Sequence, residues 1–378
     1  MDTKQNSLFN TAIKFGLPVE TDDSPSDVFI AGTSIVLADL FPAEFVADKC
    51  YPRHLCSERI NSLAKRAAQK FGVKEKAISI DMDRIPELVL KDNRNHPLEW
   101  CVSLIQDLTR RVPVDEIGYL GIAYNISLHK NNLPNLACQA AMRTGIKPEI
   151  APQEVVNYGC AGGLFSLKSV VQYCSSNQKA GIIIAFDQCS SRASFCYNPE
   201  NEMFKMDLKA TLLFSDGAVG VLIIPERLRE LFPQTLPKIV DIETAFKLSD
   251  LIRFEDNRFI LGDQIWDAVP SLVADTVIKP VLARNGLFAS DIAEWSIHQG
   301  SRDIVTRFGE PAILGLTTAQ LARSKELFDR YGNLSAPSCL LVLDSFFKDI
   351  KCERSGTAGM VVGFGAGLYL ASVLYRWE

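Results

Sequence analysis

A glycine-rich turn at Gly159–Gly163 constrains this chain more strongly than any other stretch, because it places a cysteine between a strand pattern and a helix pattern. A short apolar run precedes the turn, and apolar residues follow it at helical spacing, at Leu164, Leu167, Val170 and Val171. Cys160 is therefore expected at the N-terminus of a helix, where free N–H groups and the helix dipole favour a thiolate. The neighbouring glycines let a substrate carbonyl approach the backbone, which suits a covalent thioester enzyme.

The same stretch has a plainer interpretation. A cysteine among glycines and valines is often a small buried apolar residue with no chemical role. The turn alone leaves both interpretations open, and residues further along the chain are needed to separate them.

Composition narrows the class of protein. The net charge of −5 gives no support for nucleic-acid binding. Ten cysteines without a C-x-x-C pair and only four histidines predict no zinc or other metal site. The polar start of the chain lacks the layout of a signal peptide. Together these features predict a cytoplasmic protein with free thiols.

One uncharged stretch, 355–375, is long enough to be considered as a membrane span. Its apolar pieces are short, rich in β-formers and interrupted by glycines, so it is better interpreted as two buried strands, 359–364 and 368–375, joined by a tight turn. We therefore predict no membrane-spanning helix.

Strands and helices alternate along the chain, which predicts an α/β protein. The expected strands are 28–37, 117–124, 180–186, 212–224 and 294–298, and the expected helices are 57–71, 98–111, 136–144, 160–176, 266–285, 301–308, 316–329 and 339–347. Residues 189–209 are expected to form an irregular loop over a site. We expect a polar lead-in at 1–27, an N-terminal half at 28–228 and a C-terminal half at 229–378, with similar orders of elements in the two halves.

Two further polar residues join Cys160 as candidates. His298 follows the apolar run that begins at Trp295, and Asn333 follows Gly332 in a turn. Taken singly, the histidine suits a satisfied core position and the asparagine suits an ordinary turn. Their joint occurrence with the Cys160 turn and with a glycine-rich segment at Gly363–Gly367 favours a functional set.

These segments resemble the thiolase-fold condensing enzymes, in the branch that holds ketoacyl-ACP synthase III and the type III polyketide synthases. The matching pieces, in the family's order, are Gly159–Gly163, Phe214–Ala218, Ile297–Gly300, Tyr331–Ser335 and Gly363–Gly367. The resemblance begins at about residue 110 and runs to the end of the chain. It implies an α-β-α-β-α layered fold made of two similar halves.

The resemblance also implies a Cys160, His298 and Asn333 catalytic set for decarboxylative Claisen condensation of an acyl thioester with a malonyl thioester. The backbone of Cys160 and of the stretch containing Gly363, Phe364 and Gly365 is implied as an oxyanion hole. Phe214 is implied beside the pocket, with ordinary strand core as its alternative role. No metal or redox cofactor is implied; substrates would arrive on coenzyme A or an acyl carrier protein, and the enzyme would be a homodimer. No coenzyme A-binding residues can be transferred from the family.

Some positions depart from the family patterns. Gln299-Gly300-Ser301 follows the histidine, where the two branches have Gln-Ala-Asn or Pro-Gly-Gly, so the chain falls between them and a specialised pathway is favoured. A second hypothesis is acyl transfer to an alcohol or amine without decarboxylation, against which the retained Asn333 argues. A third is a non-catalytic partner subunit, which would be expected to lack the cysteine or the histidine.

Overall fold

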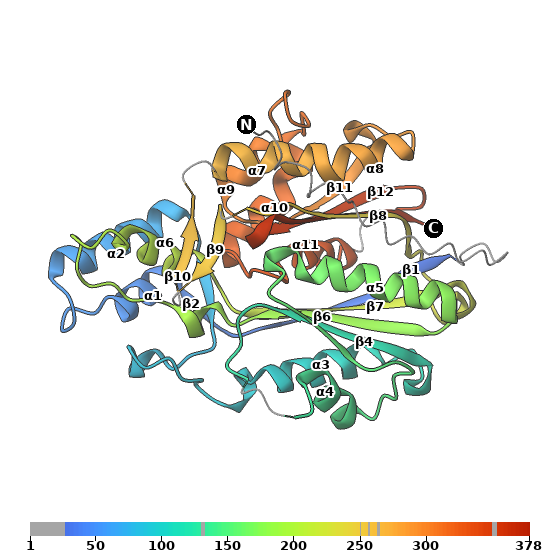
Figure 1. The fold of residues 1–378 in the computed structure, drawn as a ribbon, viewed down its shortest axis with the longest axis horizontal. Coiled ribbons are helices and arrows are strands. Elements are labelled where there is room, and N and C mark those ends of the chain that lie inside the picture. Colours follow the sequence, from blue (N-terminus) through green and yellow to red (C-terminus); the bar gives the residue numbers. More distant parts are fainter. Residues whose placement is uncertain (1–26, 130–132, 250, 256–257, 263–264, 350–353) are drawn as a thin grey trace, which may run out of the picture.

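The computed structural model describes residues 27–129, 133–249, 251–255, 258–262, 265–349 and 354–378. The lead-in predicted at 1–27 falls, except for its last residue, outside the described residues. The described chain is arranged in layers of helices and sheet, with a smaller lobe at one end (Figure 1).

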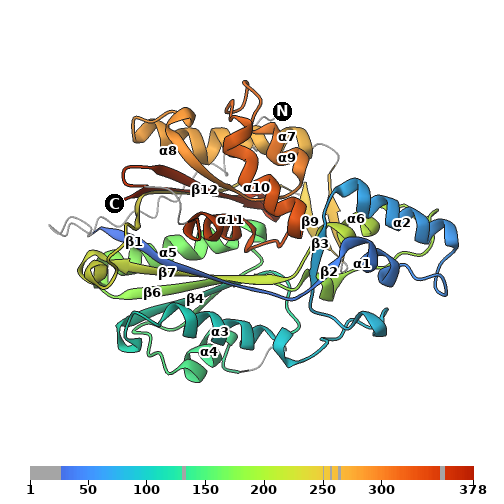
Figure 2. The ribbon, with the colours of Figure 1, turned by 180° about the vertical axis from the view of Figure 1, so that it is seen from behind.

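A single nine-stranded sheet runs through the molecule in the order β11–β12–β13–β8–β1–β7–β6–β4–β5. It is continuous because β8 and β1 pair through one residue couple, Phe29 and Lys238. This thin junction separates two parts of the sheet that face each other (Figures 1 and 2). The strands are β1 (Val28–Leu37), β4 (Ile117–Tyr124), β5 (Gln153–Val156), β6 (Ala180–Asp187), β7 (Gly217–Pro225), β8 (Pro237–Phe246), β11 (Ile292–Ile297), β12 (Ala358–Gly365) and β13 (Tyr369–Trp377).

Two helices fill the space between the parts of the sheet, and others cover its outer faces. The central pair, which lie side by side in both views, are α5 (Gly162–Asn177) and α11 (Ser338–Phe347) (Figures 1 and 2). Outside β4 and β6 lie α3 (Pro97–Leu108) and α4 (Leu136–Thr144); outside β11 and β12 lie α7 (Ile265–Val273), α8 (Lys279–Arg284), α9 (Arg302–Arg307) and α10 (Thr318–Tyr331). The predicted α-β-α-β-α thiolase architecture is confirmed.

The central layer explains why the sequence around α5 is apolar on more than one face. Leu164, Leu167 and Val170 are fully buried in a core that includes strands from both parts of the sheet. A Cβ added at Gly163 would lie 3.0 Å from Cβ of Ala185 and 3.1 Å from Cδ1 of Leu340. Glycine at this position therefore lets α5 approach β6 and α11 closely.

The two parts of the sheet share an order of elements. In the first part α5 leads into β6, which pairs with antiparallel β7; in the second α11 leads into β12, which pairs with antiparallel β13. The two central helices also begin near the same place in the molecule (Figures 1 and 2). The boundary predicted between residues 228 and 229 lies within a 3-10 turn (Glu226–Leu231) that joins β7 to β8, and the division into halves there stays a prediction.

Two adjoining sequence predictions of secondary structure are wrong. Residues 189–209 were expected to be an irregular loop and 212–224 a strand, yet α6 (Phe204–Leu213) is a helix and β7 begins only at Gly217. Phe204, Leu208 and Leu212 are four residues apart and pack into one apolar cluster, so tertiary burial stabilises a helix where local polarity suggested a loop.

The lobe at the end of the sandwich contains elements that the sequence pattern did not indicate. These are the pair β2 (Asp39–Pro42) and β3 (Glu75–Ile78), the hairpin of β9 (Ile252–Glu255) and β10 (Arg258–Leu261), and α1 (Ala43–Cys50). The predicted helix α2 (Glu58–Phe71) lies in the same lobe, and the Ser57 side chain caps it by accepting a hydrogen bond from the N–H of Ile60.

We expect Gly163→Val to lower the free energy of unfolding by about 1–3 kcal/mol, because the new side chain needs space that Ala185 and Leu340 already occupy. Chemical denaturation measures this change. Gln172→Val, at an exposed position of the same helix, is the matched control and should cost no more than about 0.5 kcal/mol. Equal costs for the two variants would contradict the close packing of the central helices.

Candidate active site

Cys160, His298 and Asn333 line one cavity of about 40 Å³. Cys160 lies in the turn before α5, His298 directly follows β11, and Asn333 lies in the turn before α11. All three side chains are at least nine-tenths buried. The structure therefore brings together three residues that are far apart in the sequence, at the point where both central helices begin.

The turn that carries Cys160 is a 3-10 turn, Gly159–Ala161, which runs directly into α5. The backbone that follows β12 lies against it: a Cβ added at Gly365 would overlap the backbone nitrogen of Cys160, and one at Gly159 would overlap the nitrogen of Ala366. Gly159 also has a φ of 57°, which favours glycine. Backbone thus meets backbone beside the sulfur, with no room for a side chain.

The remaining predicted residues of this segment have different surroundings. Phe364 and Gly365 line the cavity with Cys160, and Gly363 packs against Leu164 of α5 instead. The Phe364 ring lies edge-on to the imidazole of His298, with 5.0 Å between ring centroids. Gly363 therefore supports the turn that carries Cys160, and Phe364 and Gly365 form part of the cavity wall.

The expectation that the helix N-terminus makes Cys160 a thiolate is wrong for this structure. Burial raises the pKa of the Cys160 thiol to about 12, and a hydrogen bond with Ser335 opposes that rise. The sulfur lies 3.4 Å from the Ser335 hydroxyl oxygen. Loss of solvent is thus the largest influence on the pKa of this thiol, and it favours the neutral form.

His298 is held by backbone rather than by a charged partner. The backbone N–H of His298 donates to the carbonyl of Val362 at 2.8 Å, which continues the pairing of β11 with β12. Its Nδ1 is buried and has no hydrogen-bond partner among the described residues. Burial lowers the pKa of His298 to about 3, so the imidazole is neutral and carries one N–H donor.

Asn333 is oriented by its own turn. Its Oδ1 accepts hydrogen bonds from the N–H of Ser335 at 2.8 Å and from the hydroxyl of Ser338 at 3.1 Å. Its backbone pairs with the Leu213–Ser215 segment, through Asn333 N–H to Leu213 and Ser215 N–H to Asn333. With Oδ1 occupied, the Nδ2 amide is the donor available to the cavity.

A larger cavity of about 470 Å³ adjoins the first, and Cys160 lines both. Phe214, Ile252 and Phe259 also line both cavities, and the rings of Phe214 and Phe259 are 4.9 Å apart. The β9–β10 hairpin and Phe214 therefore form a mostly apolar partition between the two spaces. A volume of this size is within the range of small-molecule sites.

Comparisons with known proteins support the resemblance to condensing enzymes. The family model described as 3-oxoacyl-[acyl-carrier-protein (ACP)] synthase III C terminal matches residues 282–377. An alpha-pyrone synthesis polyketide synthase-like protein, Pks18 of Mycobacterium tuberculosis, is 22% identical over 84% of this chain and 81% of its own length. A 3,5-dihydroxyphenylacetyl-CoA synthase of Amycolatopsis orientalis is 25% identical over 80% of this chain and 76% of its own.

Solved structures give the same result for the fold. PKS-I of the brown alga Ectocarpus siliculosus matches with a TM-score of 0.75 and 20% identity, covering 95% of this chain and all (100%) of that one. The 1,3,6,8-tetrahydroxynaphthalene synthase of Streptomyces coelicolor matches with a TM-score of 0.74 and 18% identity, covering 93% and 99%. This chain has the thiolase fold and is similar to type III polyketide synthases.

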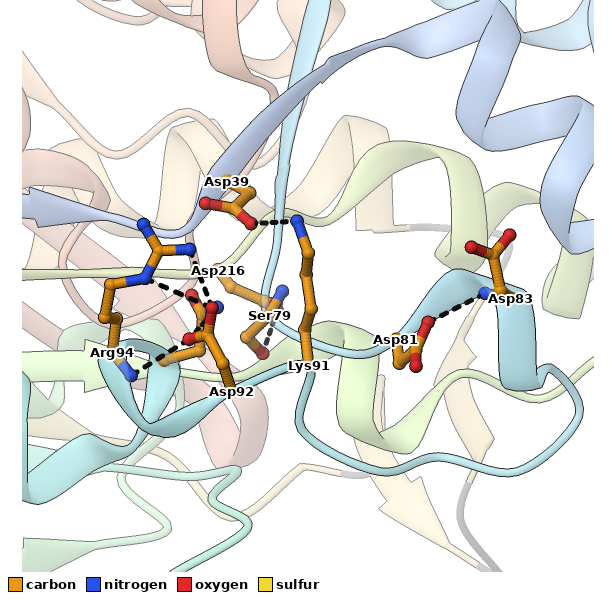
Figure 3. Close-up of polar contacts among 9 residues, drawn as sticks. Asp39, Ser79, Asp81, Asp83, Lys91, Asp92, Arg94 and Asp216 are labelled. Carbon is orange, nitrogen blue, oxygen red and sulfur yellow. Dashed lines mark hydrogen bonds and ion pairs between the residues drawn. The ribbon is translucent and has the colours of Figure 1, made fainter.

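Behind the site, buried charged side chains hold the segment that contains Phe214. Lys76 is fully buried and donates a hydrogen bond to the Phe214 carbonyl. Asp216 accepts hydrogen bonds from Ser79, at 2.8 Å from its N–H and 2.6 Å from its hydroxyl (Figure 3). Because the segment that contains Phe214 also pairs with Asn333, these contacts fix one wall of the cavity.

Sequence reasoning missed several residues of the site. Asn125 and Asp187 end the buried runs of β4 and β6, and a polar residue at the end of such a run was an available signal. Ser335 lies two residues after Asn333, inside a segment already singled out. Phe259 lies in a hairpin that no apolar pattern indicated, so its place over the cavity had no signal in the sequence.

The sequence predicts neither a metal site nor a membrane-spanning helix. Among the described residues, no group of three or more His, Cys, Asp or Glu side chains is arranged to hold a metal ion. In that same part of the chain, the helices are all too short or too polar to cross a membrane.

We expect iodoacetamide to alkylate Cys160 slowly at pH 7, with a rate that still rises by about tenfold per pH unit above about pH 9, because burial raises the thiol pKa to about 12. Peptide mass spectrometry can follow the Cys160 peptide separately from the other cysteines, and Cys160→Ser should abolish that label. A rate that levels off near pH 7 would contradict a neutral resting thiol.

Proposed function

We propose that this chain catalyses the decarboxylative Claisen condensation of an acyl thioester, loaded on Cys160, with a malonyl or related thioester. The observation that carries the proposal is the single buried cavity shared by a thiol, a neutral imidazole and an oriented amide. The reaction needs a nucleophile for the acyl group and hydrogen-bond donors for an enolate, and this set provides both.

In the loading step the sulfur of Cys160 attacks the thioester carbonyl of the donor. The bond from that carbonyl to the donor sulfur breaks, and the released thiol leaves with the proton that Cys160 loses. The N–H of Cys160 and an N–H from the Gly363–Gly367 turn are the proposed donors to the oxyanion. The contact between the Gly365 backbone and the Cys160 nitrogen supports this assignment.

In the second step a malonyl thioester loses carbon dioxide and becomes an enolate. We assign the N–H of neutral His298 and the Nδ2 amide of Asn333 as the donors that stabilise the enolate oxygen. Both are aimed into an apolar, water-poor cavity, where hydrogen bonds to a developing charge are strong. The enolate carbon then attacks the acyl group on Cys160, and the sulfur leaves and regains a proton.

The surroundings suit acyl thioesters and no dedicated cofactor. Relatives named as a polyketide synthase-like protein and as a 3,5-dihydroxyphenylacetyl-CoA synthase support coenzyme A thioesters as substrates, with carrier-protein thioesters as the alternative. We further propose a homodimer, as the family resemblance implies, built from chains with halves at 28–228 and 229–378. A cytoplasmic location is supported by the free cysteines of the described chain, which number nine.

Acyl transfer without decarboxylation is the competing function. Asn333 argues against it, because the two hydrogen bonds on its Oδ1 hold the amide in a donor orientation that such a transfer does not need. The product mass after incubation with an acyl and a malonyl thioester separates the two: loss of carbon dioxide with a longer acyl product supports condensation.

Two substitutions should separate loading from condensation. We expect Cys160→Ala to abolish acyl loading, and Asn333→Ala to load normally but condense about 10²–10³-fold more slowly, because one enolate donor is lost. Intact-protein mass spectrometry measures loading, and carbon dioxide release from the malonyl thioester measures condensation. Asn135→Ala, which removes the N-cap of α4 and a hydrogen bond to the Pro152 carbonyl, should leave both rates unchanged. Normal condensation by Asn333→Ala would show that the assigned role is wrong.

The partition between the cavities should control extender size. We expect Phe259→Ala to lower the preference for malonyl over methylmalonyl thioester by about tenfold, because its ring bounds the small cavity that holds His298 and Asn333. The ratio of kcat/KM values measures this preference. Phe254→Ala is the matched control, since Phe254 lines only the larger cavity and its loss should leave the ratio unchanged. Equal effects of the two substitutions would contradict the role of Phe259.

A further inference from the structure

An ion pair ties the β9–β10 hairpin to α6. Nε of Arg258, on β10, lies 3.4 Å from Oδ2 of Asp207, on α6. The Asp207 side chain is buried, whereas that of Arg258 is 36% exposed. The hydroxyl of Ser194 donates to the same carboxylate oxygen at 3.3 Å. The buried carboxylate thus has its charged partner on a different element, and the pair holds the two elements together.

Asp207 lies on the face of α6 that lines the two cavities of the site. Asp207, Ala210 and Leu213 are three residues apart and therefore share one face of the helix. Ala210 lines the larger cavity, and Leu213 lines the smaller one. Phe204 and Leu208 pack instead into an apolar cluster of the lobe. Apolar contacts therefore hold α6 in the lobe, and its cavity face carries the carboxylate to which the hairpin is attached.

Two neighbouring residues of β10 contact the two ends of this helix. Arg258 pairs with Asp207, which lies in the first turn of α6, and the ring of Phe259 lies 4.9 Å from that of Phe214, which directly follows the helix. β10 accordingly packs against α6 (Figure 1). Because consecutive Cα atoms stay about 3.8 Å apart, a displacement of Arg258 also displaces Phe259, whose ring bounds both cavities.

The pair is more costly to break from one side than from the other. Removal of Arg258 leaves a carboxylate that is buried without its cation, which is strongly destabilising. Asp207→Asn removes the charge but keeps the shape of the side chain, and a partly exposed guanidinium can be hydrated instead. Burial raises the pKa of Asp207 and the charge of Arg258 opposes that rise, in agreement with a desolvated pair. Arg258 is therefore the more informative residue to change.

The position of Phe259 matters for the choice of extender. Its ring bounds the small cavity that also contains His298 and Asn333, where the malonyl thioester is proposed to lose carbon dioxide. A methyl branch on the extender needs additional space in that cavity. A ring held in one place excludes the branch, whereas a ring on a loosely attached hairpin can move and admit it.

We propose that Arg258 is a positioning residue that, through Asp207, fixes the β9–β10 hairpin on α6 and thereby holds the Phe259 ring where it excludes branched malonyl thioesters. The selection of an extender rests on the proposed function. The attachment of the hairpin is a property of the free protein and can be measured without any substrate.

Hydrogen exchange and steady-state kinetics test the proposal together. Arg258→Gln should speed amide exchange in β9 and β10 by about tenfold, because the buried carboxylate loses its partner. It should also lower the ratio of kcat/KM for malonyl over methylmalonyl thioester by about fivefold, because the Phe259 ring is no longer held. Arg258→Lys keeps the charge and should restore most of both properties.

A second background separates positioning from a general loss of stability. In Phe259→Ala protein, Arg258→Gln should leave the extender ratio unchanged, because the ring that it positions is already absent. Lys205→Gln is the matched control, since Lys205 is an exposed residue of α6, and it should change neither exchange nor the ratio.

Unchanged exchange in Arg258→Gln, or an equal fall in the extender ratio with and without the Phe259 ring, would overturn the proposal. If Arg258→Gln does not fold, Asp207→Asn provides the same test with smaller expected changes in the same direction. If the unaltered protein condenses neither extender, the proposed function fails, while the exchange measurement still decides whether Arg258 holds the hairpin.

Discussion

The site depends on a contact between two stretches of backbone. The end of β12 lies so close to the turn before α5 that a side chain at Gly365 would overlap the nitrogen of Cys160. β12 belongs to the C-terminal part of the sheet and the cysteine to the N-terminal part, so the contact exists only when the layers are packed together. The layered fold is therefore the means by which two distant stretches of backbone meet beside one sulfur.

The two central helices give the site its direction. α5 and α11 lie in the same layer and begin close together, so the turns that precede them contribute Cys160 on one side and Asn333 with Ser335 on the other. β11, beside β12, ends at His298 and completes the set. The similar order of elements in the two parts of the sheet thus has a chemical consequence, because each part presents the N-terminus of its central helix to the shared cavity.

Much of this arrangement could be predicted from the sequence, since it rests on local patterns. The strand-turn-helix around Cys160, the strand before His298 and the final hairpin all have clear apolar periodicity, and the structure confirms them. α6 was missed because its apolar residues alternate with polar ones. Phe259 was missed because a short hairpin has no apolar pattern of its own. The neutral state of Cys160 could not be predicted, since desolvation depends on everything packed around the sulfur.

Electrostatically, the site is a set of neutral donors in an apolar cavity, with the buried carboxylates of Asp187 and Asp216 behind it. Such a cavity favours charge only where donors are already aimed, and in the proposed reaction these donors would serve a thioester carbonyl and an enolate oxygen. An experimental structure of the protein after incubation with an acyl thioester tests this directly. The account predicts an acyl group bonded to the Cys160 sulfur, with its carbonyl oxygen against the N–H of Cys160 and the Gly363–Gly367 backbone. An acyl group on Cys189 instead, or a carbonyl oxygen turned away from that backbone, would contradict it.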